Sequence, residues 1–246
     1  MGAFDGKRIV VTGGSSGIGL AVARTLRARG AEICVVARRA EPLAEAVAEL
    51  GNGSWGHSCD VGDPGQVEEL ALAVGSRWES VNGLVNGAGL ATMADTERTD
   101  ADLWDQCLAV NSRGPFLVTR ALLPHLNAAG HSSVVNISST LAEKPIPGMV
   151  AYCAAKAAVN GLTRAMALEV APRVRVNAVM PAVVDTPIHR SRNISRDQLE
   201  GMAKLHPLRR IGRPEDVAAA IVFLLSDESA WMTGAVIPVD GGMLAT

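Results

Sequence analysis

Short runs of β-branched and other apolar residues alternate along the chain with longer stretches of helical periodicity. The apolar runs lie at 8–12, 32–37, 83–86, 133–138, 174–180 and 235–239. The periodic stretches, with an apolar residue every third or fourth position, lie at 17–29, 42–50, 65–77, 102–128, 151–170 and 215–225. This alternation predicts parallel strands joined by helices that pack on both faces of one sheet. The high Val and Ile content of the runs is typical of strands buried on both sides.

No repeat, low-complexity tract or proline-rich linker interrupts this pattern, so residues 1–246 are expected to form one domain. The longest stretch without clear periodicity is 181–206, between a predicted strand and the last predicted helix. Because long irregular loops in compact domains usually serve function, we interpret 181–206 as a lid over a binding site.

Composition excludes several classes of protein. A chain that is 48% hydrophobic is not disordered, and a net charge of -2 argues against a nucleic-acid partner. With 3% aromatic residues, it also lacks the stacking platforms that bind single strands. The longest strongly apolar run, 218–225, is too short to cross a bilayer, and residues 1–10 lack the apolar core of a signal peptide. These features predict a cytoplasmic protein with no membrane partner.

The cysteines and histidines show no spacing of metal ligands. Cys34, Cys59, Cys107 and Cys153 lie far apart without a Cys-x-x-Cys pair, and the 5 histidines form no ligand motif. We therefore expect reduced thiols, no disulfide framework and no metal site.

A glycine-rich turn, TGGSSGIG at 12–19, follows the first predicted strand and opens the first predicted helix. Glycines at this point let backbone amides approach a pyrophosphate, whose charge the helix N-terminus also favours. The spacing Gly13-x-x-x-Gly17-x-Gly19 differs from the commoner G-x-G-x-x-G, and an ordinary tight turn is the alternative for this motif taken alone.

Tyr152, the only tyrosine, is followed one helical turn later by Lys156. Residues four apart share a helix face, so the ammonium group can lie beside the phenol. A nearby cation lowers the pKa of a phenol from about 10, which suits it to exchange protons near neutral pH. The alternative is a phenol and a lysine that both face solvent.

The glycine-rich turn, the segment Asn86-Gly87-Ala88-Gly89, the Tyr152–Lys156 pair and VDGG at 239–242 occur in one order. In these motifs the chain resembles the short-chain dehydrogenase/reductase family from about Gly6 to Gly242. The resemblance implies a doubly wound Rossmann-type α/β domain with a parallel seven-stranded sheet and helices on both faces. It implies an oxidoreductase that transfers a hydride between a nicotinamide dinucleotide and a ketone or secondary alcohol.

The resemblance also implies a catalytic set. Tyr152 would act as the general acid/base, and Lys156 would tune it. Ser139, at the end of the run 133–138, would hold the substrate oxygen, with its neighbour Ser138 as the alternative. Asn111 matches the fourth active-site residue, which supports a proton relay through the lysine and bends its helix.

Further positions match cofactor contacts of the family. They lie in the glycine-rich turn, between the runs 32–37 and 83–86, at and after the end of the run 83–86, and after the run 174–180. Together with Tyr152 and Lys156 they are Gly13, Ser15, Ser16, Gly17, Ile18, Gly19, Arg38, Asp60, Val61, Asn86, Ala88, Gly89, Pro181, Val184 and Thr186. The chain departs from the family at Gly87, where relatives carry Asn, and at Ala182, where they carry Gly.

Arg38 indicates NADP(H) as the cofactor. The run 32–37 ends at Ala37, where an NAD enzyme of this fold usually places a carboxylate, and no acid follows until Glu41. An arginine at this point can bind a 2′-phosphate through two hydrogen bonds. The alternative for this pair is that Arg38 and Arg39 are both solvated. The alternative functions are an NAD-dependent alcohol dehydrogenase and a dinucleotide sensor without activity. Degenerate relatives of the last kind lose the tyrosine or the lysine.

The small residues of the stretches 102–128 and 151–170 permit close helix approach, and relatives pair these helices across a two-fold axis. The resemblance therefore implies a homotetramer, with a homodimer as the alternative. The segment 127–131, NAAGH, lacks the basic cluster of many reductases that act on carrier-bound chains. This favours a free small-molecule carbonyl or alcohol substrate.

Overall fold

The computed structural model describes residues 2–192 and 194–246. Within these residues, seven parallel strands form one sheet in the order β3-β2-β1-β4-β5-β6-β7. The strands are β1 (Arg8–Thr12), β2 (Glu32–Ala37), β3 (Ser54–Ser58), β4 (Gly83–Asn86), β5 (Ser132–Ile137), β6 (Val174–Pro181) and β7 (Val236–Val239). The predicted doubly wound, seven-stranded parallel sheet is confirmed.

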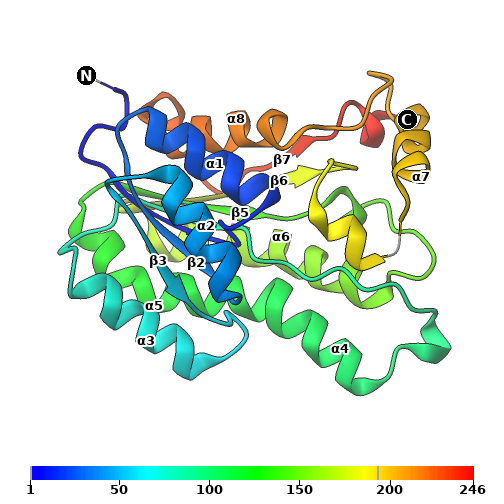
Figure 1. Ribbon diagram of the computed structural model, residues 1–246, viewed down its shortest axis with the longest axis horizontal. Helices are drawn as coiled ribbons and strands as arrows, with labels where there is room; N and C mark the ends of the chain where they lie inside the picture. Colours follow the sequence, from blue (N-terminus) through cyan, green and yellow to red (C-terminus); the bar gives the residue numbers. More distant parts are fainter. Residues whose placement is uncertain (1, 193) are drawn as a thin grey trace.

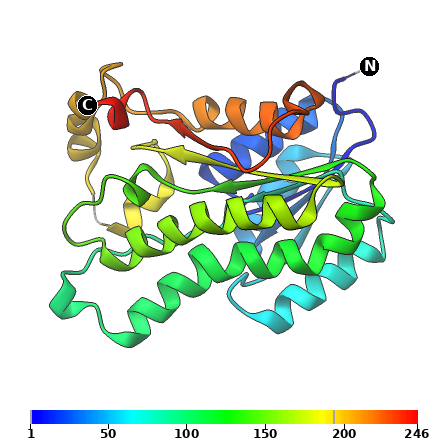
Figure 2. The same cartoon turned by 180° about the vertical axis from the view of Figure 1, so that it is seen from behind.

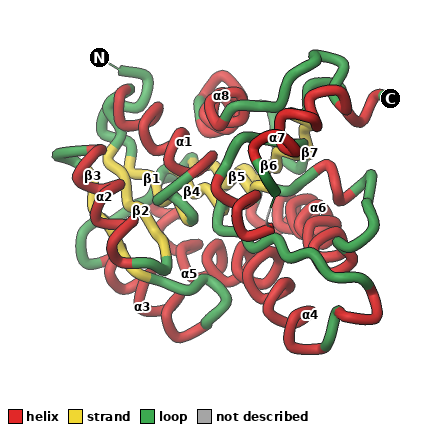
Figure 3. Tube along the Cα trace, turned by 45° about the vertical axis from the view of Figure 1, so that its right-hand side comes forward, coloured by secondary structure: helices red, strands yellow, loops and turns green. Residues whose placement is uncertain are grey.

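Helices cover both faces of this sheet (Figure 1). One face carries α1 (Gly17–Ala28), α2 (Ala40–Leu50) and α8 (Pro214–Leu225). The other carries α3 (Pro64–Gly75), α5 (Gly114–Ala128) and α6 (Val150–Val170), with α4 (Ala101–Leu108) beside α6 (Figure 2). Figure 3 shows the strands enclosed between these two helical layers. Successive strand residues point to opposite layers: Val11 and Val85 pack with α1 and α8, whereas Val10 and Leu84 pack with α3 and α5.

β3 lies outside the apolar runs of the sequence. Its residues, SWGHS, contain one large apolar side chain, Trp55, and the strand pairs only with β2 at the edge of the sheet. An edge strand is covered less completely than a central one, so it does not require the continuous Val and Ile content that marks the other strands.

The stretch 102–128 is helical throughout, as predicted, but it is not one regular α-helix. Between α4 and α5 the residues Ala109–Arg113 form a π-helical turn. The Asn111 side chain donates a hydrogen bond to the carbonyl of Cys107 at 2.9 Å, and Pro115 has no amide hydrogen to offer at the start of α5. Both features interrupt the regular pattern of backbone hydrogen bonds. Such turns inside long helices are frequent at functional sites.

The expectation that 181–206 is irregular is wrong in its local structure. The segment contains 3-10 turns at Pro187–Arg192 and Met202–Leu205, and the short helix α7 (Arg196–Gly201) between them. Position 193 lies outside the described residues. α7 begins with a capping box, in which Ser195 and Gln198 exchange backbone and side-chain hydrogen bonds. That Ser-x-x-Gln spacing was a readable signal for a helix start.

In the described part of the chain, no helix combines the length and the apolarity needed to cross a membrane. The same residues contain no group of three or more His, Cys, Asp and Glu side chains suited to hold a metal ion.

Candidate active site

A cavity of about 470 Å3 lies where β1, β4, β5 and β6 end, the edge at which open parallel sheets bind ligands. Most of the predicted site residues line it, although they come from distant parts of the chain. They are Gly13, Ser16, Gly17, Ile18, Gly19, Arg38, Gly89, Ser139, Tyr152, Lys156, Pro181, Val184 and Thr186.

The other predicted residues lie outside the lining: Ser15, Asp60, Val61, Asn86, Ala88 and Asn111. Asn86 is 3% exposed, and its side-chain amide donates to Asn136 at 2.8 Å and to Thr119 at 3.0 Å. Val61 is packed in the core under α3 and α5. Any contact of Asn86 with a ligand in the cavity would therefore come from its backbone.

The glycine-rich turn lies between two other segments of the chain. Gly13 has a positive φ of 67°, and a Cβ atom on it would lie 2.6 Å from the carbonyl carbon of Gly87. A Cβ atom on Gly17, with φ of 54°, would lie 3.1 Å from Cγ2 of Thr186. α1 begins at Gly17 and has no acidic residue in its first turn. The turn thus presents a narrow backbone cradle at a helix N-terminus, which suits a pyrophosphate.

Thr12, which sequence analysis did not single out, ties this turn to the end of β4. Its hydroxyl oxygen accepts hydrogen bonds from the amides of Gly87 at 3.1 Å and Ala88 at 3.2 Å. A Cβ atom on Gly87 would lie 2.8 Å from the carbonyl oxygen of Thr12. The departure from the family pattern at this position therefore accompanies a close approach of backbone to backbone, in which a side chain at position 87 would require Thr12 to shift.

Tyr152 and Lys156 share a face of α6 at the cavity wall. The Lys156 ammonium group lies 5.6 Å from the centroid of the Tyr152 ring and donates a hydrogen bond to the carbonyl of Ile137 at 2.7 Å. Lys156 is 4% exposed, and this burial lowers its pKa to about 8. The site can therefore hold a cation beside a phenol, as the spacing of four predicts.

The two neighbouring serines after β5 point to different partners. Ser138 donates to the side-chain oxygen of Asn160 at 2.6 Å, so its proton is directed into the protein. Ser139 accepts a hydrogen bond from the amide of Leu141 at 3.1 Å, and its own proton is left for a ligand. Geometry therefore favours Ser139 over Ser138 as the group that would hold a substrate oxygen.

Asn111 is fully buried in the π-helical turn. Its amide donates to the carbonyls of Leu90 at 2.7 Å and Cys107 at 2.9 Å, and its oxygen accepts from the amide of Leu90 at 3.2 Å. The side chain thus joins the π-helical turn to the loop after β4. If Asn111 takes part in a proton relay, it would have to do so through its backbone carbonyl, because its side chain is engaged.

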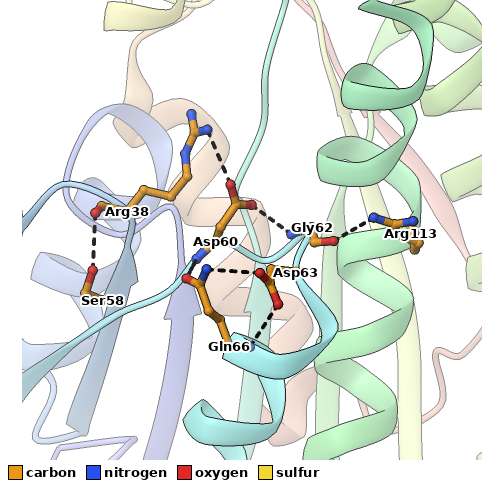
Figure 4. Close-up of polar contacts among 7 residues, drawn as sticks. All are labelled: Arg38, Ser58, Asp60, Gly62, Asp63, Gln66 and Arg113. Carbon is orange, nitrogen blue, oxygen red and sulfur yellow. Dashed lines mark hydrogen bonds and ion pairs between the residues drawn. The ribbon is translucent and has the colours of Figure 1, made fainter. Parts of the chain in front are cut away.

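Arg38 has an acidic neighbour. Its Nη1 atom lies 3.6 Å from Oδ2 of Asp60, which follows β3 (Figure 4). The other carboxylate oxygen of Asp60 accepts from the amide of Gly62 at 2.9 Å, and Arg113 binds the Gly62 carbonyl at 2.7 Å. Since the two side chains are 51% and 35% exposed, their attraction is largely screened by water. A 2′-phosphate on Arg38 would nevertheless meet a negative charge that the sequence around Arg38 does not reveal.

The cavity is also lined by residues of the loops after β4 and β5 and of the 181–206 segment. They are Leu90, Ala91, Leu141, Ile146, Ile188, His189, Met202 and Leu205. Met243 also lines the cavity. It follows β7, which lies beside β6, and no local pattern marks it as a cavity residue.

Residues 13–244 match the family described as enoyl-(acyl carrier protein) reductase. The chain is 38% identical over 244 residues to D-threitol dehydrogenase of Mycolicibacterium smegmatis. The matched region covers 97% of this chain and 93% of that relative. Among solved structures, levodione reductase superposes with a TM-score of 0.93 at 31% identity and covers 99% of each chain. The 3-ketoacyl-(acyl-carrier-protein) reductase of Brucella melitensis, complexed with NADH, superposes with a TM-score of 0.91 at 30% identity and covers 97% of this chain and 98% of its own.

Proposed function

The chain belongs to the short-chain dehydrogenase/reductase family, and on that basis we propose that it interconverts a ketone and a secondary alcohol with NADP(H). The observation that carries the proposal is the arrangement within one cavity. The glycine cradle and Arg38 line the same cavity as Ser139, Tyr152 and Lys156.

The described residues fit a dinucleotide. Gly13 and Gly17 line the cavity beside the N-terminus of α1, so backbone without side chains faces the place that a pyrophosphate would take. Pro181 and Thr186 also line the cavity and would contact the nicotinamide. When bound, the cofactor supplies or accepts the hydride at the carbonyl carbon.

Proton transfer falls to the residues of the chain. Ser139 would donate its hydrogen bond to the substrate oxygen and hold it against the Tyr152 hydroxyl. Tyr152 would give its proton to that oxygen during ketone reduction and take it back during alcohol oxidation. The Lys156 cation favours the phenolate form of Tyr152, and its bond to Ile137 fixes its position.

The choice of NADP(H) rests on Arg38, which lines the cavity after β2 where no carboxylate is present. Asp60 opposes this choice by its charge, and NAD(H) is the alternative. Steady-state kinetics with both cofactors and one ketone decide between them.

We further propose a cytoplasmic homotetramer. A groove between α4, α5 and α6 is lined by Leu108, Phe116 and Leu162, and Phe116 is 40% exposed, which suits the pairing of helices from two copies. Light scattering at micromolar concentration should give a tetramer mass. A monomer mass would overturn the assembly.

The test of the activity is NADPH consumption with a panel of ketones. Steady consumption with at least one ketone, and NADP+ reduction with its alcohol, is expected. Binding of NADPH without turnover on any ketone or alcohol would favour the dinucleotide sensor instead.

A further inference from the structure

The half of the cavity beyond Tyr152 is lined mainly by apolar side chains. They come from four separate segments: the loops after β4 and β5, the 181–206 segment, and the turn after β7. These residues are Leu90, Ala91, Leu141, Ile146, Ile188, Met202, Leu205 and Met243. Apolar lining of this kind favours ligands that release their own apolar surface from water.

Two polar side chains of this half have protein partners. Ser138 binds Asn160, and the Nε2 atom of His189 lies 2.8 Å from the carbonyl oxygen of Val184. Ser139 and Tyr152 are reserved for the reacting oxygen. Among the described residues that line the cavity, none is Asp, Glu, Asn or Gln. Further hydroxyl groups on a substrate would therefore exchange most of their hydrogen bonds to water for apolar contacts, which is costly.

The apolar walls are held in place by polar contacts behind them. Lys144 donates to the carbonyl of Met243 at 3.2 Å, and the amide of Leu208 donates to the carbonyl of Gly241 at 3.1 Å. These bonds join the turn after β7 to the loop after β5 and to the residues that follow the 181–206 segment. Figures 1 and 2 show α7 and the C-terminal turn at the same end of the molecule. These hydrogen bonds therefore connect the segments that form the wall of the pocket.

The rim of this pocket carries apolar surface in contact with water. Ile146 is 39% exposed and Leu205 is 47% exposed, and both line the cavity. A ligand with an apolar portion would cover this surface as well as its own, and the two contributions add.

We infer, resting on the proposed function, that the substrate is a ketone or secondary alcohol with an uncharged apolar chain or ring beside the reacting carbon. Ile188, Met202 and Met243 enclose that group while Ser139 and Tyr152 hold the oxygen. Polyols and hydroxyketones are poor substrates, because the described residues that line this half of the pocket are mainly apolar and offer extra hydroxyl groups few partners.

The test uses three methyl ketones, with an ethyl, a butyl or a hexyl group, and hydroxyacetone as the polar probe, all with saturating NADPH. A buried methylene contributes ~0.8 kcal/mol, so kcat/KM should rise about fourfold per methylene until the pocket is filled. Hydroxyacetone should be reduced at least ten times less efficiently than the ethyl ketone, which matches it in size.

Met202→Gln should reduce the increase of kcat/KM along the ketone series. NADPH binding, measured by fluorescence, reports whether the variant is folded. Leu72→Gln, a change at a side chain that is 75% exposed on α3 and outside the lining, should leave the series as in the wild type. A flat wild-type series, or hydroxyacetone reduced as well as the ethyl ketone, would overturn this inference and leave the proposed function standing. Absence of turnover with every ketone and with the matching alcohols would overturn both.

Discussion

The Lys156 ammonium group lies 5.6 Å from the centre of the Tyr152 ring and is held there by a hydrogen bond to the carbonyl of Ile137. The two side chains therefore form one unit, in which a buried cation faces the phenol that we propose as the proton donor. Because the lysine is almost completely buried, its charge is screened little by water. Both the reaction and the pH dependence of folding should depend on this pair.

Tyr152→Phe should lose most turnover while NADPH still binds within a few-fold of the wild-type Kd. The substitution removes the hydroxyl that exchanges the proton, and general acid/base groups contribute roughly 10²- to 10⁴-fold in rate. Stopped-flow reduction of a good ketone measures kcat, and fluorescence measures NADPH binding. A variant that keeps more than about a tenth of wild-type kcat would show that Tyr152 is not the acid/base group.

Lys156 should make folding stability depend on pH. Burial lowers its pKa from 10.5 to about 8, so between these values the unfolded chain holds a proton that the folded chain has released. The unfolding free energy of the wild type should therefore rise with pH, relative to that of Lys156→Met, by up to about 3 kcal/mol across this window. Below about pH 8 the difference between the two should be constant. Urea denaturation of both apoproteins measures it, and a difference that shrinks as pH rises contradicts the assignment.

Arg38 should give a preference for NADPH over NADH of roughly 10- to 150-fold in kcat/KM, since a hydrogen bond to a charged group contributes ~1.5–3 kcal/mol. Arg38→Asp should reverse much of this preference and leave the chemistry at Tyr152 intact. Equal kcat/KM values for both cofactors in the wild type would sink the assignment.

Asp60→Asn is the matched variant for this test. It removes the charge 3.6 Å from Arg38, and exposed ion pairs are worth at most ~1 kcal/mol, so the NADPH/NADH ratio should rise by up to about fivefold. A lower ratio in this variant would mean that Asp60 orients Arg38 rather than competes with a phosphate.

The 181–206 segment should exchange its amide hydrogens faster in the apoprotein than in a complex with cofactor and substrate. Arg196 binds Asp185 at 2.8 Å and Glu200 at 2.6 Å, yet all three are exposed to water, and such contacts open readily. Arg196→Met should raise exchange in α7 further and raise KM for the ketone more than it lowers kcat. Exchange that is equally slow with and without ligands would refute the lid.

Gly13→Ala should weaken NADPH binding strongly and lower the melting temperature of the apoprotein. The new methyl group would lie 2.6 Å from the Gly87 carbonyl carbon in a backbone conformation, φ of 67°, that alanine rarely adopts. Gly161→Ala is the control, because nothing lies within 4 Å of its Cβ position in α6. The control should be neutral or stabilising by up to about 1 kcal/mol, given the helix propensities of the two residues. Equal melting temperatures for both variants would contradict the steric argument.

Several parts of this protein follow from short-range features of its sequence. The alternation of Val-rich runs with periodic stretches predicts the layered sheet, because burial on both faces leaves its mark on every central strand. The spacing of four between Tyr152 and Lys156 places them on one helix face, because helix geometry is set by neighbouring residues alone. The positive φ at Gly13 and Gly17 likewise agrees with a turn that is readable from its glycines.

Only the tertiary structure determined which residues from separate strands and loops become neighbours at the edge of the sheet. Asp60 comes to Arg38 because β3 pairs with β2, and Met243 enters the cavity wall because β7 pairs with β6. Asn111 is committed to Leu90, in a loop that follows a different strand. These meetings depend on strand order and on the packing of loops from separate segments. Periodicity and motif spacing are local properties of the chain, so they carry no record of which loops meet.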